Sequence, residues 1–395
     1  MAPVTPTDLG FSLVGGPLRP LLLRTRWFAH LSRHPKARLV AAAAVTWGVL
    51  LVLSLVEGRA LPGAGARVPF LYDIAAMGRY LVALPVLLAV EPFIEDGLHL
   101  VVSGLARSEL IADADRPALT ATLDHVRALR DATLPTVVVI LLAFAPYGPF
   151  GGGRLGDLHT PEWAAVAGAG GTHLTAAGWW QVFACMALFR FVLYRWLWRL
   201  WLWSSVMWRV GHFRLRLVPT HPDGAGGLGF IAIGQVRFSV LFFAIGAVVA
   251  SAIGNGVAWR GQHVGDFQML LVAHFGLALV LVLGPLLLLS RPLARARWGG
   301  LYDYGALAEE YAMGFDRKWV RHRSATKEPL LGSQDIQALA DLGNAFGFVS
   351  QMRIAIFDRH TVILVVAAAG APIVPLLLLA TPAENIIRAL LKIVA

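Results

Sequence analysis

Long apolar stretches alternate with polar segments along the whole chain. Seven of them approach the roughly 20 residues that a helix needs to cross the hydrocarbon core of a membrane. They cover residues 39–56, 74–93, 134–148, 178–203, 237–257, 267–289 and 361–380. The pattern predicts an all-α fold, a polytopic transmembrane helical bundle of about seven spans, in which the third span is the shortest.

The polar segments between the spans also carry a helical pattern. In residues 116–133, 301–322 and 334–353 apolar side chains recur every three or four positions, which is typical of amphipathic helices. Each such helix has to bury one face, so we expect a cytoplasmic helical layer packed under the bundle. The tail, residues 384–395, repeats the pattern and predicts a helix lying in the membrane interface.

These patterns divide the chain into four parts. They are a basic N-terminal segment at 1–38, a transmembrane bundle at 39–289 with a helical insert at 95–133, a helical region at 290–360, and a last span with its interfacial helix at 361–395. Residues 1–38 contain no continuous apolar run of the length of a signal peptide, so we expect no cleaved leader.

The composition agrees with a membrane protein and gives it an orientation. Hydrophobic residues make up 57% and charged residues 15%, against about 25% charged in globular domains. Of the 34 Lys and Arg, 24 fall in the polar segments on the N-terminal side of the predicted membrane and 6 in those on the other side. The positive-inside rule then predicts a cytoplasmic N-terminus and a periplasmic C-terminus in a bacterial cytoplasmic (inner) membrane. The net charge of +10 reflects this orientation, and no nucleic-acid partner is expected.

The cysteine and histidine content argues against a cofactor. Cys185 is the only cysteine, which excludes an internal disulfide and every zinc site that needs two cysteines. No HExxH or comparable ligand spacing occurs, so we predict neither metal nor cofactor.

Polar residues deep within the predicted spans are functional hypotheses, because charges in hydrocarbon are costly. Arg190 lies roughly 18 Å from the outer end of its span and His274 about 10 Å into its own. Ser251 and Asn255 share one face of the fifth span. Together these four residues predict the lining of a pore or substrate path, the alternative for His274 being a hydrogen-bonded core residue. Arg195 and Arg199, by contrast, stand among tryptophans and are interpreted as an interfacial anchor.

The segment His221–Gly229 (HPDGAGGLG) is the most unusual in the chain. It contains G-x-G-x-x-G, but no strand and crossover helix surround it, so a dinucleotide fold is excluded. Glycines permit positive φ and let backbone amides converge on a phosphate, a carboxylate or a lipid headgroup. The predicted binding residues are His221, Asp223, Gly224, Gly226, Gly227, Gly229, Arg214 and Arg216. The alternatives are a tight turn without ligand, and acid–base chemistry by His221 with Asp223.

Residues 221–231 (HPDGAGGLGFI) and 329–342 (PLLGSQDIQALADL) resemble runs in a group of uncharacterised bacterial integral membrane proteins, in which HPDxAGGLGF and LLGSxDIQxLADL segments occur. The likeness covers about the C-terminal half of the chain and implies no particular activity. Since both segments fall on the predicted inner side, we expect the glycine loop and the helix after Ser333 to pack together as a gate or ligand site.

The sequence thus favours a channel or transporter for a small anion, or for a proton-coupled solute, working in the lipid bilayer as a homo-oligomer. It leaves two alternatives open. One is a membrane-embedded enzyme or lipid-handling protein that uses His221 and Asp223. The other is a non-catalytic membrane sensor or partner subunit whose cytoplasmic helices bind another protein.

Overall fold

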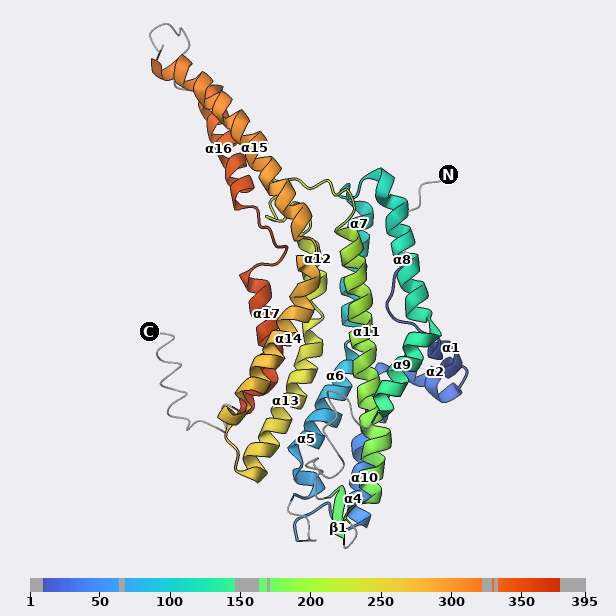
Figure 1. Ribbon diagram of the computed structural model, residues 1–395. Helices are drawn as coiled ribbons and strands as arrows, with labels where there is room; N and C mark the ends of the chain where they lie inside the picture. The colour runs from blue at the N-terminus through green and yellow to red at the C-terminus, as the bar shows by residue number, and fades with distance from the viewer. Residues whose placement is uncertain are drawn as a thin grey trace.

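The protein is an elongated bundle of helices, shown as a computed structural model in Figure 1. The structure describes residues 10–63, 68–145, 163–168, 171–321, 329 and 333–376. The long helices run up and down along one common axis, and a helical hairpin projects from the upper end of the view. The predicted all-α polytopic fold is therefore confirmed.

Six helices are long and apolar enough to cross a membrane, which makes this a multi-pass membrane protein. The first three are each assembled from several helical pieces. Pro35–Val56 joins α3 (Pro35–Ala43), η2 (Ala44–Gly48) and α4 (Val49–Val56). Ile74–Arg107 joins α5 (Ile74–Met77), η4 (Gly78–Ala83), α6 (Leu84–Ala89) and α7 (Glu91–Arg107). Ala176–Val210 joins α10 (Ala176–Trp180), η6 (Gln181–Cys185) and α11 (Met186–Val210).

The other three spans lie in the second half of the chain. Gly229–Arg260 joins α12 (Gly229–Val236) and α13 (Ser239–Arg260). Val264–Leu287 joins η7 (Val264–Phe267) and α14 (Gln268–Leu287), and Arg359–Leu376 begins with α17 (Arg359–Gly370). These six helices overlap six of the seven predicted spans.

The third predicted span, 134–148, takes a different form. Its described part is α9 (Thr133–Phe144), whose 12 residues reach about 18 Å and cannot cross a membrane alone. α9 follows the amphipathic helix α8 (Arg116–Asp131) after Ala132, which is extended, and it descends at an angle to α8 (Figure 1). Both lie along α11, with α8 in the upper half of the view and α9 below it (Figure 1). α9 is therefore shorter than the predicted span, but α8 and α9 together lead the chain from the upper end of the bundle to the lower end, so the loops before and after them lie at opposite ends, as the prediction required (Figure 1).

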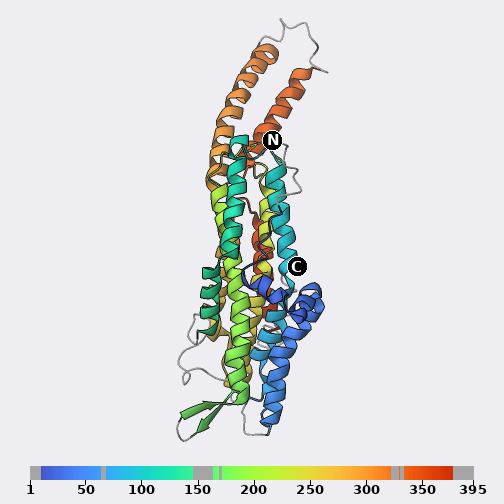
Figure 2. The same ribbon diagram turned by 90° about the vertical axis from the view of Figure 1, so that its right-hand side faces the viewer.

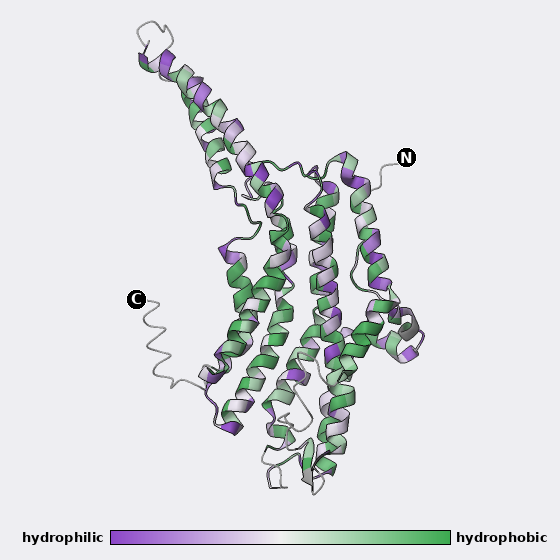
Figure 3. Cartoon of the chain, viewed as in Figure 1, coloured by the Kyte–Doolittle hydropathy of each residue, from purple (hydrophilic) through white to green (hydrophobic). Residues whose placement is uncertain are grey.

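Hydropathy shows which surface of the bundle meets lipid. Apolar residues cover the crossing helices, whereas hydrophilic residues gather on the projecting hairpin and at the ends (Figure 3). Large apolar side chains such as Val52, Leu141 and Val272 are exposed. Such faces are stable only against hydrocarbon or a partner. Inside, one continuous core joins α6, α7, α8, α11, α13 and α14.

The connecting loops collect at two ends, as alternating spans require. At the lower end Asp73 accepts a hydrogen bond from Trp163 (Nε1 to Oδ2, 2.9 Å), beside the hairpin of β1 (Ala165–Gly168) and β2 (Gly171–Leu174). At the upper end the Arg214 amide donates to Asp115 (2.8 Å). The loops therefore segregate as the sequence predicted, and which end faces the cytoplasm stays a prediction from the distribution of Lys and Arg.

The expected helical layer under the bundle is only partly found. α8 packs on α11, but α15 (Ser290–Phe315) and α16 (Gln334–Gln351) pack on each other and project beyond the bundle as a hairpin (Figures 1 and 2). A short π-helical segment, η8 (Asp316–Arg321), extends α15. The Ser333 cap is confirmed, since its hydroxyl accepts a hydrogen bond from the Asp335 amide. The predicted tail helix at 384–395 lies outside the described residues.

Candidate anion site at the junction of α8, α9 and α11

An extended N-terminal segment, residues 10–17, runs beside α8 and holds this region together. Phe11 and Leu13 are buried, and the Phe11 ring lies 6.2 Å from that of Trp203 on α11. The Leu13 amide donates to a carboxylate oxygen of Glu95 on α7 (3.1 Å). The segment therefore belongs to the core although it precedes the first span.

Gly15 and Gly16 bring this segment against two arginines. Arg195 of α11 donates to the Gly15 carbonyl, and Arg130 of α8 donates to the Ser12 carbonyl (2.7 Å). A Cβ atom at Gly15 would collide with the Arg130 side chain, and Gly16 has φ +113° and lies against the Arg195 guanidinium. Only glycines fit this close approach at a positive φ.

An acidic residue organises the neighbouring arginines. Glu91, the first residue of α7, lies 2.9 Å from Arg199 Nη2 and 3.2 Å from Arg38 Nη1. The Arg199 guanidinium also stacks over the Trp196 ring at 4.6 Å. Glu91 and Arg38 are about a quarter exposed and Arg199 is buried, so this partly buried cluster links α3, α7 and α11, and removing Glu91 would leave the buried Arg199 without its ion-pair partner.

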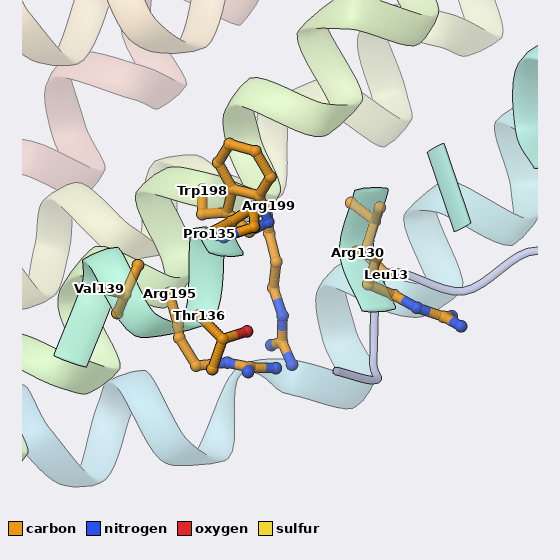
Figure 4. Close-up of a pocket in the computed structure, with 8 residues that line it drawn as sticks. All are labelled: Leu13, Arg130, Pro135, Thr136, Val139, Arg195, Trp198 and Arg199. Atoms are coloured by element: carbon orange, nitrogen blue, oxygen red, sulfur yellow. The ribbon is translucent and has the colours of Figure 1, made fainter. Parts of the chain in front are cut away.

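A small pocket opens beside these arginines. It is lined by Leu13, Arg130, Pro135, Thr136, Val139, Arg195, Trp198 and Arg199. In Figure 4 the guanidinium groups of Arg195 and Arg199 lie close together near the Thr136 side chain, whereas that of Arg130 lies apart, toward Leu13. The cavity measures about 10 Å³, which corresponds to one group the size of a water molecule.

All the charged residues that line this pocket are positively charged. Its three charged residues are arginines, and the nearest acids, Glu91 and Asp131, contact the arginines from outside it. Arg199 is 7% exposed, and its Nε atom has no hydrogen-bond partner among the described residues. In the part of the chain that the structure describes, no carboxylate oxygen lies within 4 Å of the Arg195 guanidinium. We name this set of lining residues the arginine pocket.

Arg130 itself is neutralised. Its guanidinium pairs with the adjacent Asp131, and that hydrogen bond lowers the pKa of Asp131 below its ordinary value despite partial burial. The Asp131 carboxylate also accepts the Gly16 amide (2.9 Å). Arg195 thus faces the pocket without a carboxylate at ion-pair distance, and Arg199 has an Nε atom that no described residue bonds.

Sequence reasoning interpreted Arg195 and Arg199 as an interfacial anchor and did not include them among the binding residues. In the structure Arg199 and Trp196 are buried and bonded within the bundle, and the Trp196 indole donates to the Leu87 carbonyl (2.8 Å). The pair Gly15–Gly16 was the signal that could have pointed to this site, since two adjacent glycines permit a close backbone approach.

Arg190, a predicted pore residue, contacts the C-terminal end of α9. Its Nη1 donates to the Ala145 carbonyl at 2.8 Å, just past the last residue of α9. A cation at a helix C-terminus is stabilised by the helix dipole and by otherwise unsatisfied carbonyls. Arg190 is buried, so this contact explains how a charge is accommodated at that depth.

The other predicted path residues bind different neighbours. His274 Nε2 lies 3.2 Å from the Ala369 carbonyl of α17, and Ser251 donates to the Val248 carbonyl of its own helix (3.0 Å). The Asn255 side chain accepts the Ile74 amide (3.0 Å) and donates to Asp73 (2.9 Å). Each residue thus joins two helices or closes a helical turn, and the four do not share a hydrogen-bonded cluster in the described structure.

The backbone amides of the glycine loop converge as predicted, but they bind the carboxylate of Asp223, a residue of the loop itself. The amides of Ala225 (2.8 Å), Gly227 (3.1 Å) and Gly229 (2.8 Å) all donate to the Asp223 carboxylate. His221 Nδ1 lies 2.8 Å from the same carboxylate. Partial burial raises the pKa of Asp223, and these hydrogen bonds more than offset it, so the pKa lies below the ordinary value. An external anion would have to displace this carboxylate.

The remaining predicted residues of the loop stabilise its surroundings. Gly224, Gly226 and Gly227 have φ between +61° and +97°, as the turn prediction required. The Arg214 amide donates to Asp115, and Arg216 lies 3.7 Å from Asp113, so both serve contacts between loops at the upper end.

The loop does pack against the segment containing α16, at its C-terminal end. The Arg353 amide donates to the Gly224 carbonyl (2.8 Å), and the Arg353 guanidinium donates to the Asp223 carbonyl (2.7 Å). These two bonds fasten the loop to the first residues after α16, and the Met352 side chain also contacts Gly226. The predicted association of the two segments is therefore present, but it involves residues 352–353 and not the beginning of α16.

No protein-family model, curated protein or solved structure matches this chain. The resemblance of residues 221–231 and 329–342 to a group of bacterial membrane proteins stays a prediction. Among the described residues no group of three or more His, Cys, Asp or Glu side chains could hold a metal ion.

Proposed function

We propose that the protein is a channel or transporter for a small anion in a bacterial cytoplasmic membrane, and that the arginine pocket is its anion-binding site. The observation that carries this proposal is the lining of the pocket, which contains three arginines and no carboxylate. A buried guanidinium with an unpaired nitrogen, such as that of Arg199, is stabilised when an anion completes its hydrogen bonds.

The short helix α9 supports the same proposal. Its first two turns contribute Pro135, Thr136 and Val139 to the pocket, and no side chain caps its N-terminus at Ala132. The N-terminus of a helix carries partial positive charge and free amides, which favour an anion. Helices that end within a bundle supply such termini to substrate sites in many transporters.

The size of the site restricts the anion. A cavity of about 10 Å³ accommodates a group the size of one water molecule, so we propose a halide or a similarly small anion. We further propose that the N-terminus is cytoplasmic, the C-terminus periplasmic and the protein a homo-oligomer. The orientation follows from the 24 to 6 distribution of Lys and Arg between the two sets of loops.

Chloride flux in proteoliposomes tests this function. We expect Arg195→Gln to lower the flux about tenfold or more, because a hydrogen bond to a charged group contributes about 1.5–3 kcal/mol. Arg291→Gln, which neutralises an exposed arginine on α15, is the matched control and should leave the flux unchanged. Wild-type protein that carries no chloride above empty vesicles, or an equal flux in both variants, would contradict the proposal.

The projecting hairpin favours a second function, that of a partner subunit or sensor. Trp298, Tyr302 and Val320 are each more than half exposed on α15 and η8, outside the crossing helices. Exposed apolar side chains in such a position are typical of a protein-binding surface. A copurifying protein that is lost on substitution of Tyr302 by Ser, with no chloride flux in the wild type, would favour this function over transport.

The enzymatic alternative receives less support from the geometry. His221 and Asp223 do lie together, but three backbone amides already hold the Asp223 carboxylate in the loop. A carboxylate with that many donors is a weak base. The pair therefore fits a structural role better than acid–base catalysis.

A further inference from the structure

A strongly basic segment precedes the first span. Residues 9–56 contain no Asp or Glu, and six Lys or Arg fall within them. One of the six, Arg38, pairs with Glu91. The other five form no ion pair within the described structure; they are Arg19, Arg24, Arg26, Arg33 and Lys36.

This segment forms two short helices on the side of the bundle. α1 (Leu18–Leu23) packs on α2 (Arg26–Arg33), and α2 packs on α3. Both views show the pair standing out laterally at about the height where α8 gives way to α9, and in Figure 2 the pair and α9 lie on opposite sides of the bundle. Because the apolar span starts at Pro35, directly after α2, the two helices lie at the level where the chain enters the membrane.

α2 separates its polar and apolar residues. Arg26, His30 and Arg33 recur at spacings of four and three, so they share one face, and all three are exposed. Leu31 points to the opposite side and is buried. Trp27 is 63% exposed, in a position where an indole is stabilised by the membrane interface. A short amphipathic helix with these residues is typical of a surface that rests on lipid headgroups.

We propose that α1, α2 and the first turn of α3, which contains Lys36, form a docking surface for anionic phospholipid headgroups. Five basic side chains without acidic partners in the described structure complement a negatively charged leaflet, and each such residue near a membrane surface contributes about 1 kcal/mol. Lipid headgroups also lie next to this surface, because the first span enters the bilayer directly after α2. The proposal rests on the basic surface alone and is independent of anion transport.

Quenching of a fluorophore on α2 tests the lipid preference. Ser32→Cys places a label on an exposed position, while the natural Cys185 is fully buried and escapes modification. The labelled full-length protein is reconstituted in bilayers of phosphatidylcholine and phosphatidylglycerol, with bromine on one lipid or the other. At low salt we expect brominated phosphatidylglycerol to quench about threefold more strongly at equal mole fraction, since several basic residues act together.

Two comparisons decide whether the charges are responsible. Arg26→Gln/Arg33→Gln should abolish the preference, whereas Arg291→Gln/Arg295→Gln, which removes two exposed arginines from α15, should keep it. Raising the ionic strength to about 1 M, where the screening length falls to about 3 Å, should remove the preference from the unsubstituted protein as well. Equal quenching by the two lipids at low salt, or a preference that survives Arg26→Gln/Arg33→Gln, would overturn the proposal.

Discussion

At the scale of single residues, Asp223 shows how a loop can satisfy its own amides. The sequence predicted that backbone N–H groups converge near Gly224–Gly229, and they do. It did not reveal that the anion they bind is the carboxylate two residues before Ala225. Aspartates often accept hydrogen bonds from backbone amides a few residues after them, so the sequence was compatible with this arrangement. The sequence-based prediction instead assigned the amides to an external anion.

Removal of the Asp223 carboxylate should loosen the loop. We expect Asp223→Ala to accelerate hydrogen exchange at Ala225, Gly227 and Gly229 about tenfold or more, because each lost bond costs about 1–3 kcal/mol. Hydrogen-exchange mass spectrometry measures this. Glu109→Ala, which removes an exposed acid at the same end of the molecule, is the control. Unchanged protection in Asp223→Ala would show that the carboxylate does not hold the loop.

At the scale of elements, α9 shows what hydropathy can and cannot predict. The apolar residues from Leu134 onward were recognised, because hydrophobicity is a property of the local sequence. The break at Ala132 has a local cause, because Pro135 has no N–H to bond the Asp131 carbonyl four residues earlier. The pairing of Arg190 with the Ala145 carbonyl joins segments 45 residues apart in the chain. The depth of Arg190 was predicted, whereas its partner required the tertiary structure.

The cap on α9 gives a stability prediction. Arg190→Met should lower the free energy of unfolding by about 1.5–3 kcal/mol, the contribution of a hydrogen bond to a charged group. Arg190→Lys keeps the charge next to the same carbonyl and should retain much of that stability. Thermal unfolding in detergent compares the two variants. If both unfold at the wild-type temperature, the contact with α9 has no stabilising role.

At the scale of the whole molecule, the alternation of spans could be predicted from the sequence, whereas the packing of the polar segments between them could not. The sequence placed loops correctly in two sets, because every crossing reverses the chain. It could not show that α15 and α16 bury their apolar faces on each other and project from the bundle, since amphipathicity does not identify the partner of a face.

The orientation of the bundle is measurable with single cysteines. His263→Cys lies in the lower loop before α14, and Glu310→Cys lies on the hairpin at the upper end. We expect a membrane-impermeant thiol reagent added to intact bacterial cells to label position 263 only, because Lys and Arg gather on the cytoplasmic side. Labelling of position 310 alone in intact cells would reverse the topology.

The position of a bound anion tests directly whether the arginine pocket binds small anions. Bromide replaces chloride in crystals of the full-length protein and is located by its anomalous scattering. We predict a peak in contact with the guanidinium groups of Arg195 and Arg199, and its loss in Arg195→Gln. A bromide peak elsewhere in the bundle, with none in the arginine pocket at saturating bromide, would contradict the account.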